Sequence, residues 1–98
     1  MADIAVTSMG PRAFKVEVHE GTRTSSFDVT VPRSLIDELR LPEDDLDRVV
    51  RESFVFLLER EPASAILPAF SLDVIARYFP EYKKELLDPN RSKQLILV

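Results

Sequence analysis

The sequence predicts an α+β fold, in which an N-terminal antiparallel β-hairpin packs on a small bundle of three to four helices. Three observations predict it. Two stretches near the N-terminus alternate apolar and polar residues around a glycine turn. A long middle segment repeats apolar residues every three or four positions, as one face of a helix does. Prolines then divide the remaining chain into short helical pieces.

The 98 residues are enough for one hydrophobic core and too few for two. We expect a disordered N-terminal tail over residues 1–12 and a single α+β domain over residues 13–88. A C-terminal tail follows over residues 89–98. Its end, Gln94–Val98, is strand-like, so it either adds a strand to a sheet edge or stays loose.

The hairpin comprises residues 14–18 and 27–31, each with apolar residues at every second position. Between them, Gly21 supplies the positive φ that the first central position of a type II′ turn needs. With Glu20 opposite Arg23, the register is set. It pairs Phe14 with Val29, Val16 with Phe27, Lys15 with Asp28, and His19 with Thr24. Cross-strand packing and charge therefore agree with the turn.

The first helix is expected after Pro32, over residues 34–41, with Ser34 and Asp37 as a short capping box. The main helix begins near Asp44 or Asp45 and runs to Glu61. Its apolar stripe is Leu46, Val49, Val50, Phe54, Leu57 and Leu58. The stretch 54–58 is apolar nearly all round, so it must be covered on more than one side.

The remaining elements are short. Residues 63–67 are expected to form a single helical turn. Ser71 is predicted to cap a helix whose inner face carries Leu72, Ile75, Ala76 and Phe79. Pro80 suits the first position of a last helix, which carries Tyr82, Leu86 and Leu87.

No residue pattern points to catalysis, so we expect neither an enzyme nor a cofactor. His19, the only histidine, is predicted at an exposed strand end. Ser53 lacks the glycine-flanked elbow of a serine nucleophile and is expected to pack against a neighbouring element. The acidic residues around 43–47 lack the spacing of a calcium loop, and no metal site is expected. The absence of cysteine excludes disulfides and thiol chemistry.

Charge argues against a nucleic-acid partner, because the net charge is -4 and no basic stripe is present. One alternative remains: strand, short helix and long helix follow in the order of a ribbon-helix-helix DNA-binding regulator. In that arrangement Ser26, Asp28 and Thr30 would face the major groove. Asp28 would then point a carboxylate into the most negative part of the duplex surface, and the strand already pairs within its own chain; both weaken this alternative.

The remaining interpretation is a protein-binding or regulatory module whose partner is another protein or a second copy of itself. The candidate contact residues combine aromatic and aliphatic surface on the helical half: Val55, Phe56, Tyr78, Phe79 and Tyr82. The competing interpretation is that these residues belong to the core.

The segment 53–82 resembles a group of small bacterial proteins of uncharacterised function. The residues that carry the resemblance are Phe54-Val55-Phe56-Leu57-Leu58-Glu59-Arg60-Glu61-Pro62, Ile66-Leu67, Phe70, Leu72 and Tyr78-Phe79-Pro80-Glu81-Tyr82. The resemblance implies a bacterial, cytoplasmic protein and no known activity. A cytoplasmic location also fits the first twelve residues, which carry neither a secretory signal nor a membrane span.

Overall fold

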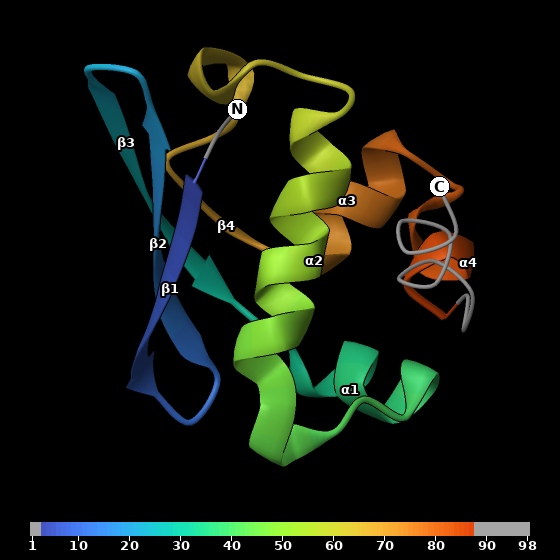
Figure 1. Cartoon of the computed structure of the whole chain (residues 1–98). Helices are drawn as coiled ribbons and strands as arrows, with labels where there is room; N and C mark the ends of the chain where they lie inside the picture. The colour runs from blue at the N-terminus through green and yellow to red at the C-terminus, as the bar shows by residue number, and fades with distance from the viewer. Residues whose placement is uncertain (1–2, 88–98) are drawn as a thin grey trace, which may run out of the picture.

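The computed structural model describes residues 3–87 and confirms the α+β class. Figure 1 shows the order of its elements along the chain. They are β1 (Asp3–Gly10), β2 (Ala13–Glu20), β3 (Arg23–Thr30), α1 (Arg33–Leu39), the 3₁₀ turn η1 (Glu43–Asp45), α2 (Leu46–Leu58), the 3₁₀ turn η2 (Ala63–Ala65), β4 (Ala69–Ser71), α3 (Asp73–Tyr78) and α4 (Tyr82–Leu87).

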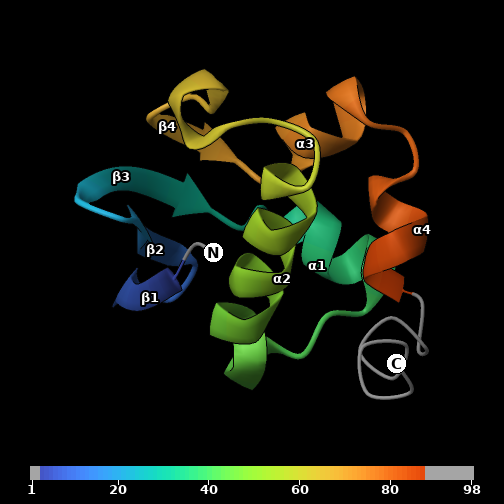
Figure 2. The same ribbon diagram turned by 45° about the horizontal axis from the view of Figure 1, so that its top comes forward.

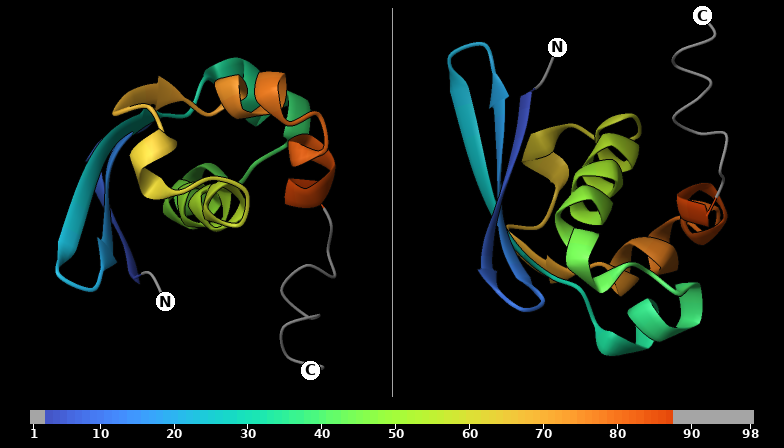
Figure 3. Two further views of the ribbon diagram at one scale, coloured as in Figure 1. Left: turned by 90° about the horizontal axis from the view of Figure 1, so that it is seen from above. Right: turned by 60° about the horizontal axis from the view of Figure 1, so that its bottom comes forward.

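The four strands form one sheet in the order β1-β2-β3-β4. The first three strands are antiparallel neighbours, whereas β4 runs parallel to β3. Helix α2 lies between the sheet and α4, so the helices all stand on one side of the sheet (Figure 3). The other face of the sheet carries the polar residues of the strands, as alternation requires.

The predicted hairpin is β2 and β3, and its register is confirmed at every predicted pair. Gly21 has a φ of 62°, and no other residue of this turn has a positive φ, which is the sign pattern of a type II′ turn. The inward residues Val16, Phe27 and Val29 are buried. Local alternation and turn chemistry were therefore sufficient to specify this part of the fold.

The predicted disordered tail over residues 1–12 is wrong, because Asp3–Gly10 forms a strand that pairs with β2. Ile4 lies opposite Val18 and Val6 opposite Val16, and both side chains pack against the core. The two residues Pro11 and Arg12 connect β1 to β2. Only two large apolar residues of β1, Ile4 and Val6, show the alternation of a strand, which is too few for the local pattern to reveal it.

The helix boundaries differ from the predicted ones at both ends. Helix α2 ends at Leu58, so the predicted end at Glu61 is wrong, and α4 begins at Tyr82, so Pro80 is not its first residue. Helix α1 begins at Arg33, and no side chain caps it, so the capping box at Ser34 is wrong. Residues 43–45 form a 3₁₀ turn instead of the start of the main helix. Ser71 is wrong as a helix cap, because it ends β4 and donates a hydrogen bond to the carboxylate of Asp73. The predicted strand-like end, Gln94–Val98, lies outside the described residues.

The core lies between the inner face of the sheet and α2. Phe54 of α2 is fully buried between Phe27 of β3 and Phe70 of β4, with ring centroids 5.2 Å and 5.9 Å away. Phe70 belongs to a strand that the sequence did not predict. The sheet edge formed by β4 therefore helps to enclose the most buried part of α2.

Candidate protein-binding groove

The C-terminal end of α2 presents two sides, and the first faces α4. Phe56 is fully buried there, and its ring meets those of Phe79 and Tyr82 edge-on, with centroids 5.8 Å and 5.3 Å away. The guanidinium of Arg60 lies 3.6 Å above the centre of the Phe56 ring. Such a cation–π contact is favourable, more so when it is partly removed from water.

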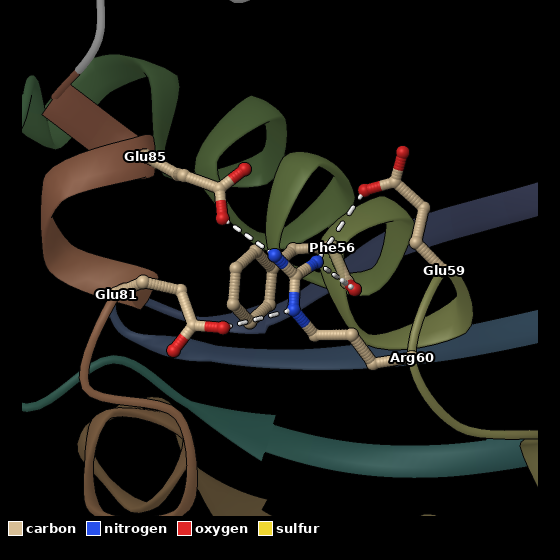
Figure 4. Close-up of polar contacts among 5 residues, drawn as sticks. All are labelled: Phe56, Glu59, Arg60, Glu81 and Glu85. Carbon is tan, nitrogen blue, oxygen red and sulfur yellow. Dashed lines mark hydrogen bonds and ion pairs between the residues drawn. The ribbon is translucent and has the colours of Figure 1, made fainter.

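Arg60 joins this side of α2 to the start of α4 (Figure 4). Its Nη2 donates to Glu85 at 2.6 Å, its Nε donates to Glu81 at 3.4 Å, and its Nη1 donates to the Phe56 carbonyl at 3.1 Å. Glu59 adds an ion pair at 3.6 Å. Because the Arg60 side chain is only 24% exposed, this network covers the Phe56 ring and holds α4 in place.

A buried hydroxyl pair completes the contact between α2 and α4. Ser53 Oγ donates to the Val49 carbonyl at 2.8 Å and lies 2.6 Å from the Tyr82 hydroxyl. Because the single hydroxyl proton of Ser53 is used on Val49, the Tyr82 hydroxyl must donate to Ser53. Ser53 is fully buried, which confirms the prediction that it is a packing residue.

The second side of α2 faces an open apolar groove with a volume of about 410 Å³. In Figure 2 the loop with η2, strand β4 and helix α3 surround the C-terminal end of α2. The residues that line the groove are Leu57, Glu61, Ala65, Ile66, Leu67, Phe70, Val74, Ile75, Tyr78 and Phe79. Leu67 is 52% exposed and Tyr78 is 72% exposed, so large apolar surface remains in water at this place.

The structure separates the five predicted contact residues. Phe56 and Tyr82 are fully buried, so the prediction that they form a contact surface is wrong. They were misassigned because the sequence does not show that α4 packs on this side of α2. Val55 is exposed but does not line the groove. Tyr78 and Phe79 both line it, and Phe79 also contacts Phe56, so its ring separates the two sides.

Sequence reasoning missed the groove residues that come from the chain between η2 and α3. Leu67 and Phe70 were missed because β4 was not predicted and the preceding loop has no periodic pattern. One signal was available: Leu67 precedes Pro68 in a segment too short to bury it. A large apolar residue in such a loop is a candidate for an exposed contact.

The residues considered for catalysis lie apart from the groove. His19 is at the exposed end of β2, where its Nδ1 lies 3.0 Å from Thr24 Oγ1, the predicted cross-strand neighbour. Within residues 3–87, no three His, Cys, Asp or Glu side chains lie close enough together to hold a metal ion. The acidic residues Glu43, Asp44 and Asp47 instead border a hollow of about 380 Å³ beside the end of β1.

Comparison with known proteins yields no match: no protein-family model, curated protein or solved structure is significantly similar to this chain. The resemblance to small bacterial proteins therefore stays a prediction. None of the helices in the described part of the chain is long and apolar enough to cross a membrane.

Proposed function

We propose that this chain is a non-enzymatic module that binds a partner protein through the groove between α2, the η2 loop and α3. The observation that carries the proposal is the apolar lining with Tyr78 and Leu67 exposed on it. Exposed clusters of this kind are uncommon on monomeric proteins unless something binds them. Tyr and other large side chains also supply much of the binding energy at protein interfaces.

The occupant that fits best is a short segment of another protein with apolar anchors and a basic residue. Apart from Glu61, every residue that lines the groove is uncharged at neutral pH. Within residues 3–87, no basic side chain forms an ion pair with Glu61, whereas the neighbouring Arg60 has three carboxylate partners. A lysine or arginine beside the apolar anchors would pair with Glu61. A small polar ligand fits less well, because few hydrogen-bonding groups converge in the groove.

Selection from a displayed library of random peptides tests this proposal even though the partner is unidentified. We expect the selected peptides to contain at least two large apolar residues and one lysine or arginine. Their affinity should fall about tenfold for Tyr78→Ser and for Leu67→Ser, since each removes one apolar anchor. Glu61→Gln should weaken only the peptides that carry the basic residue.

Met9→Ser and Val55→Ser are matched controls, because both residues are exposed and apolar but do not line the groove. They should leave the affinity unchanged. Chemical-shift changes on peptide addition should map to α3 and the η2 loop. Failure to select any peptide, or equal losses in the control variants, would overturn the proposal.

The structure gives less support to a ribbon-helix-helix regulator. That arrangement pairs one strand of each chain with its copy. Here residues 28–30 of β3 pair with β2 on one side and with β4 on the other, so this part of the strand, which includes Asp28 and Thr30, has no free edge for a second chain. Ser26, Asp28 and Thr30 do lie on the exposed face. A duplex-binding measurement at low salt tests this alternative, and tight binding would favour it over the groove.

A cytoplasmic location is part of the same proposal. It is supported by the absence of cysteine from all 98 residues, which suits a reducing compartment. Fractionation of cells that express the tagged chain would test it.

A further inference from the structure

Among residues 3–87, no strand pairs with the outer edge of β1. Strand β1 is the first strand of the sheet and pairs on one side only, with β2. Natural proteins usually shield such an edge with lysine, proline or a bulge. Within Asp3–Ser8 there is one charge, no proline and a regular register, and the only irregularity comes after Ser8. The unshielded stretch is therefore long enough to accept another strand.

The register of the hairpin determines which backbone groups point out of this edge. Around a two-residue turn, Glu20 and Arg23 are the first hydrogen-bonded pair, so the even-numbered residues of β2 bond to β3. Three backbone hydrogen bonds agree with this alternation. On the β2 side, Val31 N donates to the Arg12 carbonyl at 2.9 Å. On the β4 side, Asp28 N donates to the Pro68 carbonyl at 2.8 Å and Leu72 N donates to the Thr30 carbonyl at 3.0 Å.

By the same alternation, the odd-numbered residues of β2 bond to β1. Their partners are Asp3, Ala5 and Thr7. The N–H and C=O groups of Ile4, Val6 and Ser8 consequently point away from the sheet. The side chains of Ile4 and Val6 pack against the core but are only half-buried, so apolar surface accompanies the free backbone groups.

We propose that β1 pairs antiparallel with β1 of a second copy of this chain, so that two sheets join into one across a two-fold axis at Ala5. Only residues whose backbone groups point outward can form the hydrogen-bonded pairs, which limits the register. With the axis at Ala5, Ile4 of each copy faces Val6 of the other, and four backbone hydrogen bonds form. This interface is separate from the groove proposed above.

Self-pairing in this register is also compatible with the charges. Asp3, the one charged residue of β1, faces Thr7 of the second copy, and Lys15 is the β2 neighbour of that Thr7. No two carboxylates of β1 itself therefore meet across the axis, although the chain carries a net charge of -4. Ala5 faces Ala5 on the outer side of the sheet, where both are small enough for close approach.

Two single-cysteine variants test the register in a chain that has no cysteine of its own. Across the axis, residue 5 and its copy form a non-hydrogen-bonded pair with Cα atoms about 4.5 Å apart, which suits a disulfide. Residue 7 and its copy are offset by four positions, or about 13 Å along the strands. Under mild oxidation, Ala5→Cys should form covalent dimers at least about tenfold faster than Thr7→Cys.

Thr7→Cys is a matched control, because both positions are exposed on the same face of the same strand. Equal rates would indicate random collisions and overturn the proposal. If neither variant forms its own dimer but a mixture of the two cross-links, the strands pair with the axis at Val6, and the proposed register is wrong.

Amide hydrogen exchange of the unmodified chain provides a second readout. In a monomer the amides of Ala5 and Thr7 should exchange slowly and those of Ile4 and Val6 quickly, because only the first two bond to β2. As the concentration rises and light scattering shows a dimer, Ile4 and Val6 should become protected. A dimer in which these two amides still exchange quickly, or a chain that stays monomeric at millimolar concentration, would overturn the proposal.

Discussion

The two sides of the C-terminal end of α2 are only one residue apart in sequence, yet they are covered very differently. Phe56 and Arg60 face α4, where rings and carboxylates surround them. Leu57, although itself buried, borders an open groove together with Glu61. A step of one residue turns a helix by about 100°, so neighbouring side chains meet different parts of the fold.

This difference shows how a polar residue can complete the burial of an aromatic one. Arg60 lies over Phe56 and also binds Glu81 and Glu85, so one side chain covers the ring and joins two helices. Glu61 has no equivalent arrangement in the described structure. The apolar surface beside it consequently stays accessible, and that surface is where a partner can bind.

The largest expected effect comes from the closed side. Phe56→Ala should lower the free energy of unfolding by about 3 to 5 kcal/mol, because it leaves a cavity among Phe79, Tyr82 and Arg60. Urea denaturation followed by circular dichroism measures it. A loss under about 1 kcal/mol would mean that Phe56 is not a core residue.

Arg60→Met should cost about 1 to 2 kcal/mol, since it removes both the cation–π contact and the ion pairs with α4. Part of this difference should disappear at 1 M salt, where the Debye length is about 3 Å. Arg33→Met is the matched control, because the Arg33–Glu43 pair is exposed on both sides. An equal loss in the control would contradict the special role of Arg60.

Tyr82→Phe should cost about 1 kcal/mol, because it removes the buried donor to Ser53 while the ring stays in place. Tyr78→Phe is the control on the open side and should leave the unfolding free energy unchanged. Thermal unfolding of the two variants side by side tests the contrast. No loss for Tyr82→Phe would show that the hydroxyl pair adds nothing to stability.

The smallest effect is expected for Tyr78→Ser, which should change the unfolding free energy by less than about 0.5 kcal/mol. The Tyr78 side chain is mostly in water, so its removal leaves no cavity. Urea denaturation at low protein concentration measures it without interference from binding. A loss above about 2 kcal/mol would instead make Tyr78 a core residue and remove it from the proposed contact surface.

Sequence patterns were most informative where a structure depends on residues close together in the chain. The β2–β3 register was predicted because alternation, a glycine turn and facing charges all act over about ten residues. Ser53 was correctly assigned as a packing residue. Strand β1 was missed because its stability comes from pairing with β2, not from its own short apolar pattern.

The candidate groove was predicted only in part. Tyr78 and Phe79 were identified because aromatic residues stood out in a short helical segment. Phe56 and Tyr82 were placed on the same surface although they are buried. Whether an aromatic side chain is covered depends on contacts between α2 and α4, which are more than 20 residues apart in the chain.

The sequence by itself therefore determined the α+β class, the hairpin register and the apolar stripe of α2, since each depends on local periodicity and turn conformation. Only the tertiary structure decided that Phe56 is enclosed while Leu57 borders an open groove, and that β1 forms the edge of the sheet. The physical reason is that burial and strand pairing depend on which distant segments pack together, and residue spacing along one segment does not specify its neighbours.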